Sequence, residues 1–270
     1  MKKTKFTPLL ALLGAVLALS SCNKKEEATA PAAVSQEALS QIRALGFSTH
    51  EVRKVAEGYV VEGDMLLTPE LLASAPEQRL LRVGQDEQYR TTNLVGRLPR
   101  TLTVSLSSQF PSSYVAALDE AIRRYNAQNL QLRFRRVTSG AADLPVTFAS
   151  DLGPGVLGQS GGFPSGGNPA PGFKLVPNVI GNRSTNAIAT IMAHEIGHCI
   201  GFRHTDYFNR ANSCGALSPL PFEAGGNVGA IQIPGTPANA DPNSWMLACT
   251  GPDVNRPFNR NDLIALDFLY

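Results

Sequence analysis

Three of the four histidines of this chain fall in one eleven-residue window, His194 to His204, which reads HEIGHCIGFRH. Residues four apart on a helix lie one turn apart on the same face, so His194 and His198 can hold one ion between them. Gly201 can take the left-handed conformation that ends a helix, and the turn that follows can bring back His204 as a third imidazole. Three protein ligands leave the fourth position of a zinc ion open, which is typical of a catalytic site.

Glu195 lies beside this metal-binding face, where its carboxylate can reach water at the metal rather than the metal itself. The alternative is a buried helix that happens to carry histidines. The long form of the pattern, with its glycine and third histidine, is far more specific than H-E-x-x-H alone. We therefore predict that His194, His198 and His204 bind Zn²⁺ and that Glu195 is the catalytic general base.

The window, continued by Thr205-Asp206, resembles the metal motif of the metzincin zinc endopeptidases, and most closely that of the bacterial HEIGH-type metallopeptidases. The resemblance covers residues 97–270. It implies an α+β catalytic domain, with a twisted mixed sheet and two helices above a cleft and an irregular lower subdomain ending in a helix. It also implies a Met-turn, a methionine beneath the zinc, which Met246 would supply.

The hydrophobic pattern of the catalytic region agrees with that order of elements. Strands are predicted over 101–106, 130–134, 144–148 and 173–176, with helices over 111–128, from Ser184 through the metal motif, and over 262–270. The resemblance also makes the Gly/Pro-rich segment 153–164 the edge strand of the cleft, where Leu157, Gly158 and Gln159 would pair with a peptide substrate. An ordinary surface loop is the alternative.

The N-terminus has the pattern of an export signal. Three lysines in the first five residues precede an apolar run over 9–19, which is too short to span a bilayer. The run ends at Leu19-Ser20-Ser21-Cys22, which resembles a bacterial lipobox with Cys22 as the lipidated residue; an ordinary signal peptide is the alternative. Residues 23–27 resemble a sorting tag of Gram-negative surface lipoproteins. We expect an exported bacterial lipoprotein of the outer membrane, with the cell surface as a further destination.

These patterns divide the chain into four parts. They are a signal peptide (1–21), a lipidated tether (22–34), a small N-terminal region (35–93) that is a candidate propeptide, and the zinc metallopeptidase catalytic domain (97–270). In the N-terminal region we expect a helix over 35–45 and a hairpin over 59–67.

The sequence Val61-Glu62-Gly63-Asp64 resembles the F-x-G-D motif of astacin propeptides, whose aspartate occupies the zinc position that water needs. Asp64 is therefore a candidate latch. A carboxylate is a good zinc ligand, and Gly63 would let the backbone approach the metal closely. The alternative is that Gly63-Asp64 only turns the hairpin.

Three cysteines follow Cys22 in the sequence. An exported protein can keep disulfides, and an odd count leaves one thiol over. Cys199 lies inside the metal helix, where a small apolar packing role is the plainer account. Cys214 and Cys249 lie in loop-rich sequence, so we predict that they form a disulfide.

Loss of residues 1–21 removes three lysines and no acidic residue, so the formal net charge changes from +2 to −1. A near-neutral chain gives no electrostatic case for nucleic-acid binding, and the arginines between Arg123 and Arg136 are predicted to lie on solvated faces. We expect a monomer that takes a polypeptide substrate and meets the membrane through its lipid anchor.

Two departures limit what the resemblance implies. Thr205 stands where astacins have glutamate and adamalysins aspartate, and Ala248 stands where some metzincins have a tyrosine. The expected function is a zinc-dependent endopeptidase. The alternatives are a zinc amidase acting on cell-wall peptides and a non-catalytic surface binding lipoprotein. Retention of Glu195, which ligates nothing, argues against a binding protein.

Overall fold

The computed structural model describes residues 33–73, 88–215, 230–237 and 241–270. The expected signal peptide, Cys22 and residues 22–32 of the expected tether lie outside the described residues. Within the described part of the chain, no helix is both long enough and apolar enough to cross a membrane.

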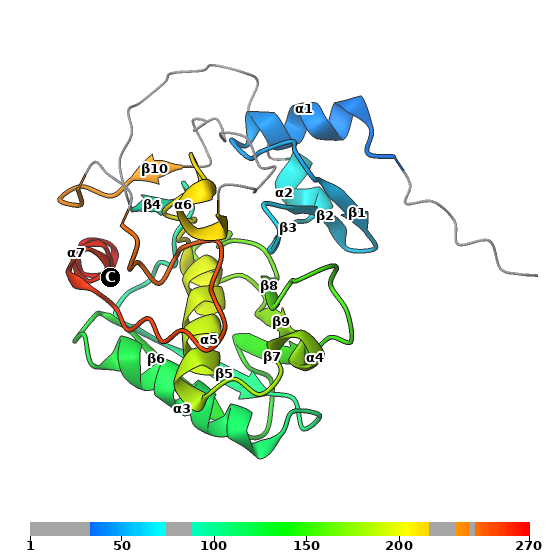
Figure 1. Ribbon diagram of the computed structural model, residues 1–270. Coiled ribbons are helices and arrows are strands. Elements are labelled where there is room, and N and C mark those ends of the chain that lie inside the picture. Colours follow the sequence, from blue (N-terminus) through cyan, green and yellow to red (C-terminus); the bar gives the residue numbers. More distant parts are fainter. Residues whose placement is uncertain (1–32, 74–87, 216–229, 238–240) are drawn as a thin grey trace, which may run out of the picture. The chain divides into compact units, whose positions relative to one another are not determined.

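A mixed sheet of eight strands organises the described residues (Figure 1). Its strands lie in the order β1 (Arg53–Val55), β2 (Gly58–Val61), β3 (Met65–Leu67), β8 (Gly158–Ser160), β9 (Phe173–Leu175), β7 (Leu144–Phe148), β5 (Arg100–Leu106) and β6 (Leu132–Val137). The four strands from β9 to β6 are parallel to their neighbours, whereas β8 runs antiparallel to β9. The α+β architecture expected from the sequence is confirmed.

Alternation along the parallel strands turns their apolar side chains to the two long helices. Leu102 and Val104 of β5 and Leu132 of β6 are fully buried. The polar residues that alternate with them along the two strands are partly or fully exposed. The helices are α3 (Ser112–Asn126) and α5 (Thr185–Ile200), which pack against each other. The Tyr125 hydroxyl of α3 donates to the Ala193 carbonyl of α5 at 2.7 Å. This packing fixes α5, the helix of the metal motif, against the sheet.

Both ends of α5 are set by the local sequence. The Ser184 hydroxyl accepts from the Ala187 amide at 3.3 Å, which satisfies one of the free N–H groups of the first turn. At the other end Gly201 has φ +117°, and a Cβ there would lie 2.7 Å from Leu94 Cδ2. The Phe202 amide then bonds back to the Gly197 carbonyl at 2.9 Å. The chain therefore reverses immediately before His204, as the motif predicts.

Arg124 is not on a solvated face, so that prediction was wrong. Its side chain is 5% exposed, because α3 presents it to α5 and to the loop that precedes the last helix. Its guanidinium donates to the Glu120 carboxylate, the Thr190 hydroxyl, the Asn255 side chain and the carbonyls of Asn186 and Arg256. A buried arginine is tolerated where its donors are satisfied in this way.

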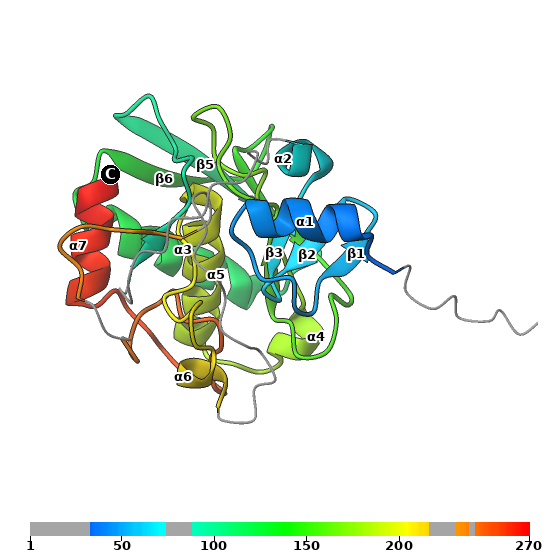
Figure 2. The ribbon, with the colours of Figure 1, turned by 90° about the horizontal axis from the view of Figure 1, so that it is seen from above.

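The small N-terminal region begins with α1 (Gln36–Ala44), which Ser35 caps, and its first described stretch ends with α2 (Pro69–Ala73), which contacts α1. The expected hairpin is confirmed, since β2 and β3 pair antiparallel. Figure 2 shows α1 beside β2 and β3, and β3 in turn pairs with β8. The region has a core to which Phe163 of the catalytic region also contributes. Its other members are Ile42, Leu45, Phe47, Val61, Met65, Leu67 and Leu72. The region thus extends the catalytic sheet and packs against it.

The chain that follows the metal helix is irregular. Its short elements are α6 (Ala211–Cys214), β10 (Ile231–Gln232), which pairs with β4 (Tyr89–Arg90), and a closing helix α7 (Arg260–Leu269). A short helix α4 (Pro177–Ile180) precedes α5. A disulfide joins Cys214 at the end of α6 to Cys249, and Cys199 is a buried free thiol. Residues 216–229 and 238–240 of the intervening loop lie outside the described part.

Replacing Cys214 and Cys249 together by serine is expected to lower the free energy of unfolding by about 3–4 kcal/mol, because the bridge closes a loop with a sequence separation of 35. Urea denaturation of the oxidised wild type and the double variant measures this difference. Reduction of the wild type should reproduce it. Equal stability of the oxidised and reduced wild type would contradict the prediction.

Candidate metal centre

The three histidines of the motif converge on one point. Their Nε2 atoms lie 3.1 Å apart for His194 and His198, 3.2 Å for His198 and His204, and 3.3 Å for His194 and His204. A tetrahedral zinc with Zn–N distances of about 2.0 Å would hold its ligand atoms about 3.3 Å apart. The spacing of the three nitrogens therefore fits zinc without rearrangement of the chain.

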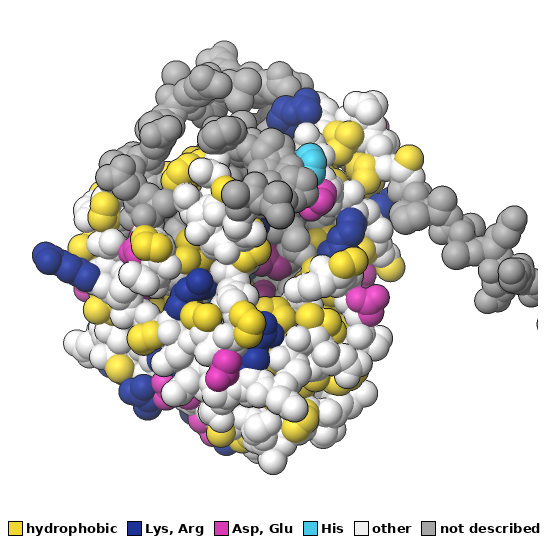
Figure 3. All heavy atoms as spheres, viewed as in Figure 1, with side chains coloured by type: hydrophobic (Ala, Val, Ile, Leu, Met, Phe, Trp, Pro, Cys, Tyr) yellow, Lys and Arg dark blue, Asp and Glu magenta, His cyan; other side chains and the backbone are white. Residues whose placement is uncertain are grey.

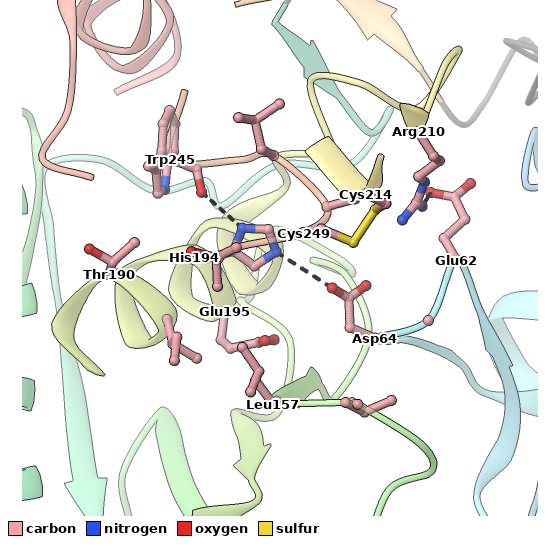
Figure 4. Close-up of a pocket in the computed structure, with 18 of the residues that line it drawn as sticks. Glu62, Asp64, Leu157, Thr190, His194, Glu195, Arg210, Cys214, Trp245 and Cys249 are labelled. Carbon is pink, nitrogen blue, oxygen red and sulfur yellow. Dashed lines mark hydrogen bonds and ion pairs between the residues drawn. A yellow bond between two sulfur atoms is a disulfide. The ribbon is translucent and has the colours of Figure 1, made fainter. Parts of the chain in front are cut away.

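Backbone carbonyls fix which nitrogen of two histidines is available as a ligand. His194 Nδ1 lies 2.9 Å from the Trp245 carbonyl, and His198 Nδ1 lies 2.9 Å from the Phe202 carbonyl. A carbonyl only accepts, so each Nδ1 carries the proton and each Nε2 presents its lone pair to the centre. Figure 4 shows the first of these contacts.

The structure brings Asp64 to the same centre (Figure 4). Its Oδ2 lies 3.1 Å from His204 Nε2 and 3.5 Å from His194 Nε2, and its Oδ1 lies 3.9 Å from His198 Nε2. Burial acts to raise the pKa of Asp64, but the imidazoles, His204 foremost, hold it well below its usual range. These four residues are grouped closely enough to hold one metal ion, with Asp64 as the fourth ligand.

The turn that carries Asp64 serves the hairpin and the metal centre together. Val61 pairs with Met65, so the hairpin loop is Glu62-Gly63-Asp64, and the left-handed φ of +53° at Glu62 and +92° at Gly63 suits such a short hairpin loop. The Asp64 carbonyl accepts from the Ser160 amide at 2.9 Å, which ties the turn to β8. The two interpretations of Gly63-Asp64 offered by the sequence are therefore compatible.

Glu62 fastens this turn through two arginines. Its carboxylate pairs with Arg203 and lies 3.5 Å from Arg210 Nη2, and all three side chains are buried. The Arg203 guanidinium also lies 4.3 Å from the centroid of the Phe47 ring and donates to the Gly46 carbonyl. An ion pair that is buried and further hydrogen-bonded is costly to break from one side. The N-terminal region is thus held at the metal motif by charge as well as by apolar packing.

Glu195 lies against β8, where Gly158 leaves room for its carboxylate. A Cβ on Gly158 would lie 2.5 Å from Glu195 Oε1. The other oxygen, Oε2, is buried and makes no hydrogen bond to a described residue. Burial, and then the charge of Asp64, raise the pKa of Glu195 well above its usual range. A carboxyl group with a raised pKa beside three potential metal ligands is suited to proton transfer.

Met246 lies directly beneath the metal helix. A Cβ on Gly197 would meet Met246 Sδ at 2.5 Å and come within 3.3 Å of Trp245 Nε1. The glycine between Glu195 and His198 therefore admits the methionine and the indole to the underside of α5. The Trp245 Nε1 donates to the Ala193 carbonyl at 3.3 Å. This bond holds Trp245 in place, and with it the Trp245 carbonyl that orients His194.

The strand β8 is not the unpaired edge that the sequence analysis expected. Its Ser160 is covered by β3, which adds in parallel at Met65. The reason is the small N-terminal region, whose hairpin supplies three further strands to the sheet. Leu157 and Gly158 remain at the wall of a cleft of about 310 Å³, which also contains Asp64, His194 and Glu195. Gln159 is buried and pairs with Lys174 of β9.

Thr205 and Ala248, the two residues at which the sequence departs from the related families, both lie near the metal centre. Thr205 is fully buried with its amide on the Met246 carbonyl at 2.9 Å, and its hydroxyl makes no hydrogen bond to a described residue. Ala248 lines the cleft and donates its amide to Asp206 Oδ1 at 3.0 Å.

On the face of the molecule drawn in Figure 3, acidic, basic and hydrophobic side chains are interspersed.

The family comparison agrees with the site. A model of the dual-action HEIGH metallo-peptidase family matches residues 60–270, so the chain belongs to this family of metallopeptidases. That match begins inside the small N-terminal region, at β2. Among solved structures, "Structure of Myroilysin" is 17% identical over 63% of this chain and 79% of that chain, with a TM-score of 0.40. "Crystal structure of myroilysin" is 15% identical over 64% of this chain and 83% of that chain, with a TM-score of 0.39. The search of curated proteins finds no match.

Several residues of the site escaped the sequence analysis. Glu62 lies inside the motif that contains Asp64, but the sequence analysis predicted no role for it. The available signal was a second carboxylate two residues from a candidate metal ligand. Arg203 and Arg210 flank His204 in sequence, so basic residues around the third histidine were a second signal. The carbonyls of Phe202 and Trp245 carry no sequence signal, since any residue provides one.

Proposed function

We propose that this chain is a zinc-dependent endopeptidase in which Glu195 is the general base. The observation that carries the proposal is the triangle of three Nε2 atoms, 3.1–3.3 Å apart, with the buried Glu195 carboxylate beside the same cleft. His194, His198 and His204 would hold the ion. Zinc bound there supplies Lewis acidity, which polarises a scissile carbonyl and lowers the pKa of water.

The chain's own residues supply the proton transfers and the placement of the substrate. Glu195 accepts a proton from the attacking water and then delivers it to the leaving amine, so one carboxyl group serves both steps. Gly158 leaves room for that carboxylate next to β8. Gly158, at the cleft wall, is the main-chain position closest to Glu195 for an extended peptide, whereas the carbonyl of Leu157 already accepts from the Val176 amide at 2.9 Å.

We also propose that the small N-terminal region holds the enzyme latent. Asp64 lies where it would take the fourth ligand position, and the Glu62 pairs with Arg203 and Arg210 keep it there. The strand β3 covers β8 at Ser160, next to the segment that would receive a substrate. A substrate would therefore compete with Asp64 and β3 for the same site.

Zinc stoichiometry and hydrolysis test the proposed function together. We expect about one zinc per chain, and hydrolysis of an unfolded protein that disappears with chelation and returns when one equivalent of zinc is restored. Wild type and Asp64→Ala are assayed in parallel, so that latency does not hide the activity. Hydrolysis that persists after the zinc is removed would refute the proposal. Cleavage of purified cell wall in place of unfolded protein would indicate an amidase.

A further inference from the structure

The cleft continues past the metal centre into a side pocket. From His194 and Glu195 the cleft extends by one turn toward the N-terminus of α5. Its other wall on this side is the segment 247–250, which follows Met246. The lining residues on this side are Thr190, Ile191, Trp245, Leu247, Ala248, Thr250 and Arg256. Most of this wall is apolar, which suits the aliphatic stem of a side chain. Arg256 places a cationic group in it.

The backbone of Arg256 is held firmly by its neighbours. Its amide donates to the Thr190 hydroxyl at 2.9 Å, and its carbonyl accepts from Arg124 Nη1 at 3.3 Å. Its Nη1 donates to the Cys249 carbonyl at 3.0 Å. A guanidinium that is fixed at one corner by a backbone carbonyl is preorganised to present its other donors to a ligand.

The charge of Arg256 is only partly compensated. Its side chain is partly buried, and no carboxylate of a described residue lies within ion-pair distance of it. Burial lowers the pKa of Arg256, while the more distant Asp206 raises it. Asp206 is itself engaged, by the Ala248 amide at 3.0 Å and the Ser213 hydroxyl at 2.5 Å. By contrast Arg210, also at the cleft, already faces Glu62.

Thr250 also lines this side of the cleft, but its hydroxyl is shielded from solvent and is therefore not presented to a ligand. The charged group available here is the Arg256 guanidinium. A guanidinium beside an apolar wall matches the oxygens of a carboxylate at the end of a short aliphatic stem.

We propose that Arg256 binds the acidic side chain of a substrate residue next to the scissile bond. Preferred substrates are then polypeptides with glutamate or aspartate at that position. The inference rests on the proposed peptidase function and names its specificity. It predicts discrimination between glutamate and its uncharged isostere, because a pocket built for a charged hydrogen bond rejects a ligand that lacks it.

The test uses the zinc-loaded full-length chain, both wild type and Asp64→Ala. Cleavage sites are first mapped by mass spectrometry in an unfolded protein. Matched peptides with glutamate, glutamine or lysine beside the mapped bond are then compared by kcat/KM. We expect the glutamate peptide to exceed the glutamine peptide by at least ~10-fold. Arg256→Gln should reduce this ratio to about one and leave cleavage of the glutamine peptide within about threefold of wild type.

Two further variants separate recognition from structure. Arg256→Glu should favour the lysine peptide, whereas Arg135→Gln, which removes an exposed arginine on β6, should keep the wild-type ratio. Thermal unfolding of each variant controls for folding. A wild-type ratio near one, a ratio that survives Arg256→Gln, or an equal loss for both peptides would overturn the inference. If none of the peptides nor the unfolded protein is cleaved, the proposed peptidase function itself fails.

Discussion

Replacing Glu195 with glutamine is expected to lower peptide hydrolysis by at least ~10²-fold while the chain keeps its zinc. Glutamine has nearly the same shape, so it fits the space that Gly158 leaves beside β8. It cannot accept the proton of water or pass it to a leaving amine. Since the carboxylate is not one of the three nitrogen ligands, the metal should stay bound.

The comparison needs kinetics and metal content on the same samples. Initial rates are divided by the zinc content found by elemental analysis, again with wild type and the Asp64→Ala background side by side. Glu70→Gln, an exposed carboxylate on α2, is the matched control and should be silent. Undiminished turnover per zinc in Glu195→Gln would remove Glu195 from the mechanism. Loss of zinc in that variant would instead show that it supports the metal.

Features decided within a few residues could be predicted from the sequence. The start of α5 at Ser184, its end at Gly201 and the return of His204 each depend on one turn of chain. The hairpin over 59–67 followed from its own pattern of apolar residues and turn. The spacing of the three histidines alone predicted the metal centre, because a helix face and one left-handed glycine suffice to bring them together.

Features decided by tertiary contacts could not be predicted in this way. The sequence around Arg124 is typical of a solvated helix face. Only the packing of α3 on α5 shows that the donors of its guanidinium are satisfied inside the protein. The pairing of Ser160 with Met65 joins positions 95 residues apart in the sequence, and no local pattern predicts it. Gly197 was part of the motif, but the reason for a glycine there is that the sulfur of Met246 takes the space of a Cβ, and this contact is seen only in the folded chain.

The latch gives the second large effect. Asp64→Ala in the full-length chain is expected to raise activity per zinc by at least ~10-fold without any cleavage of the chain, which corresponds to about 1.4 kcal/mol of lost inhibition. The variant removes the carboxylate that lies 3.1 Å from His204 Nε2 and opens the position that water needs. The rest of the N-terminal region should stay in place, because its own core and the Glu62 pairs with Arg203 and Arg210 are untouched.

Two matched variants show whether the charge of Asp64 itself is responsible. Asp64→Asn keeps the shape and loses the charge, so it should also be activated, although less than Asp64→Ala because an amide oxygen remains a weak ligand. Asp151→Ala, an exposed aspartate before the cleft segment, should leave activity unchanged. The intact mass of each protein after the assay excludes cleavage as the cause. Equal activity per zinc for wild type and Asp64→Ala would show that Asp64 only turns the hairpin. The position of its carboxylate among the three histidines would then need another explanation.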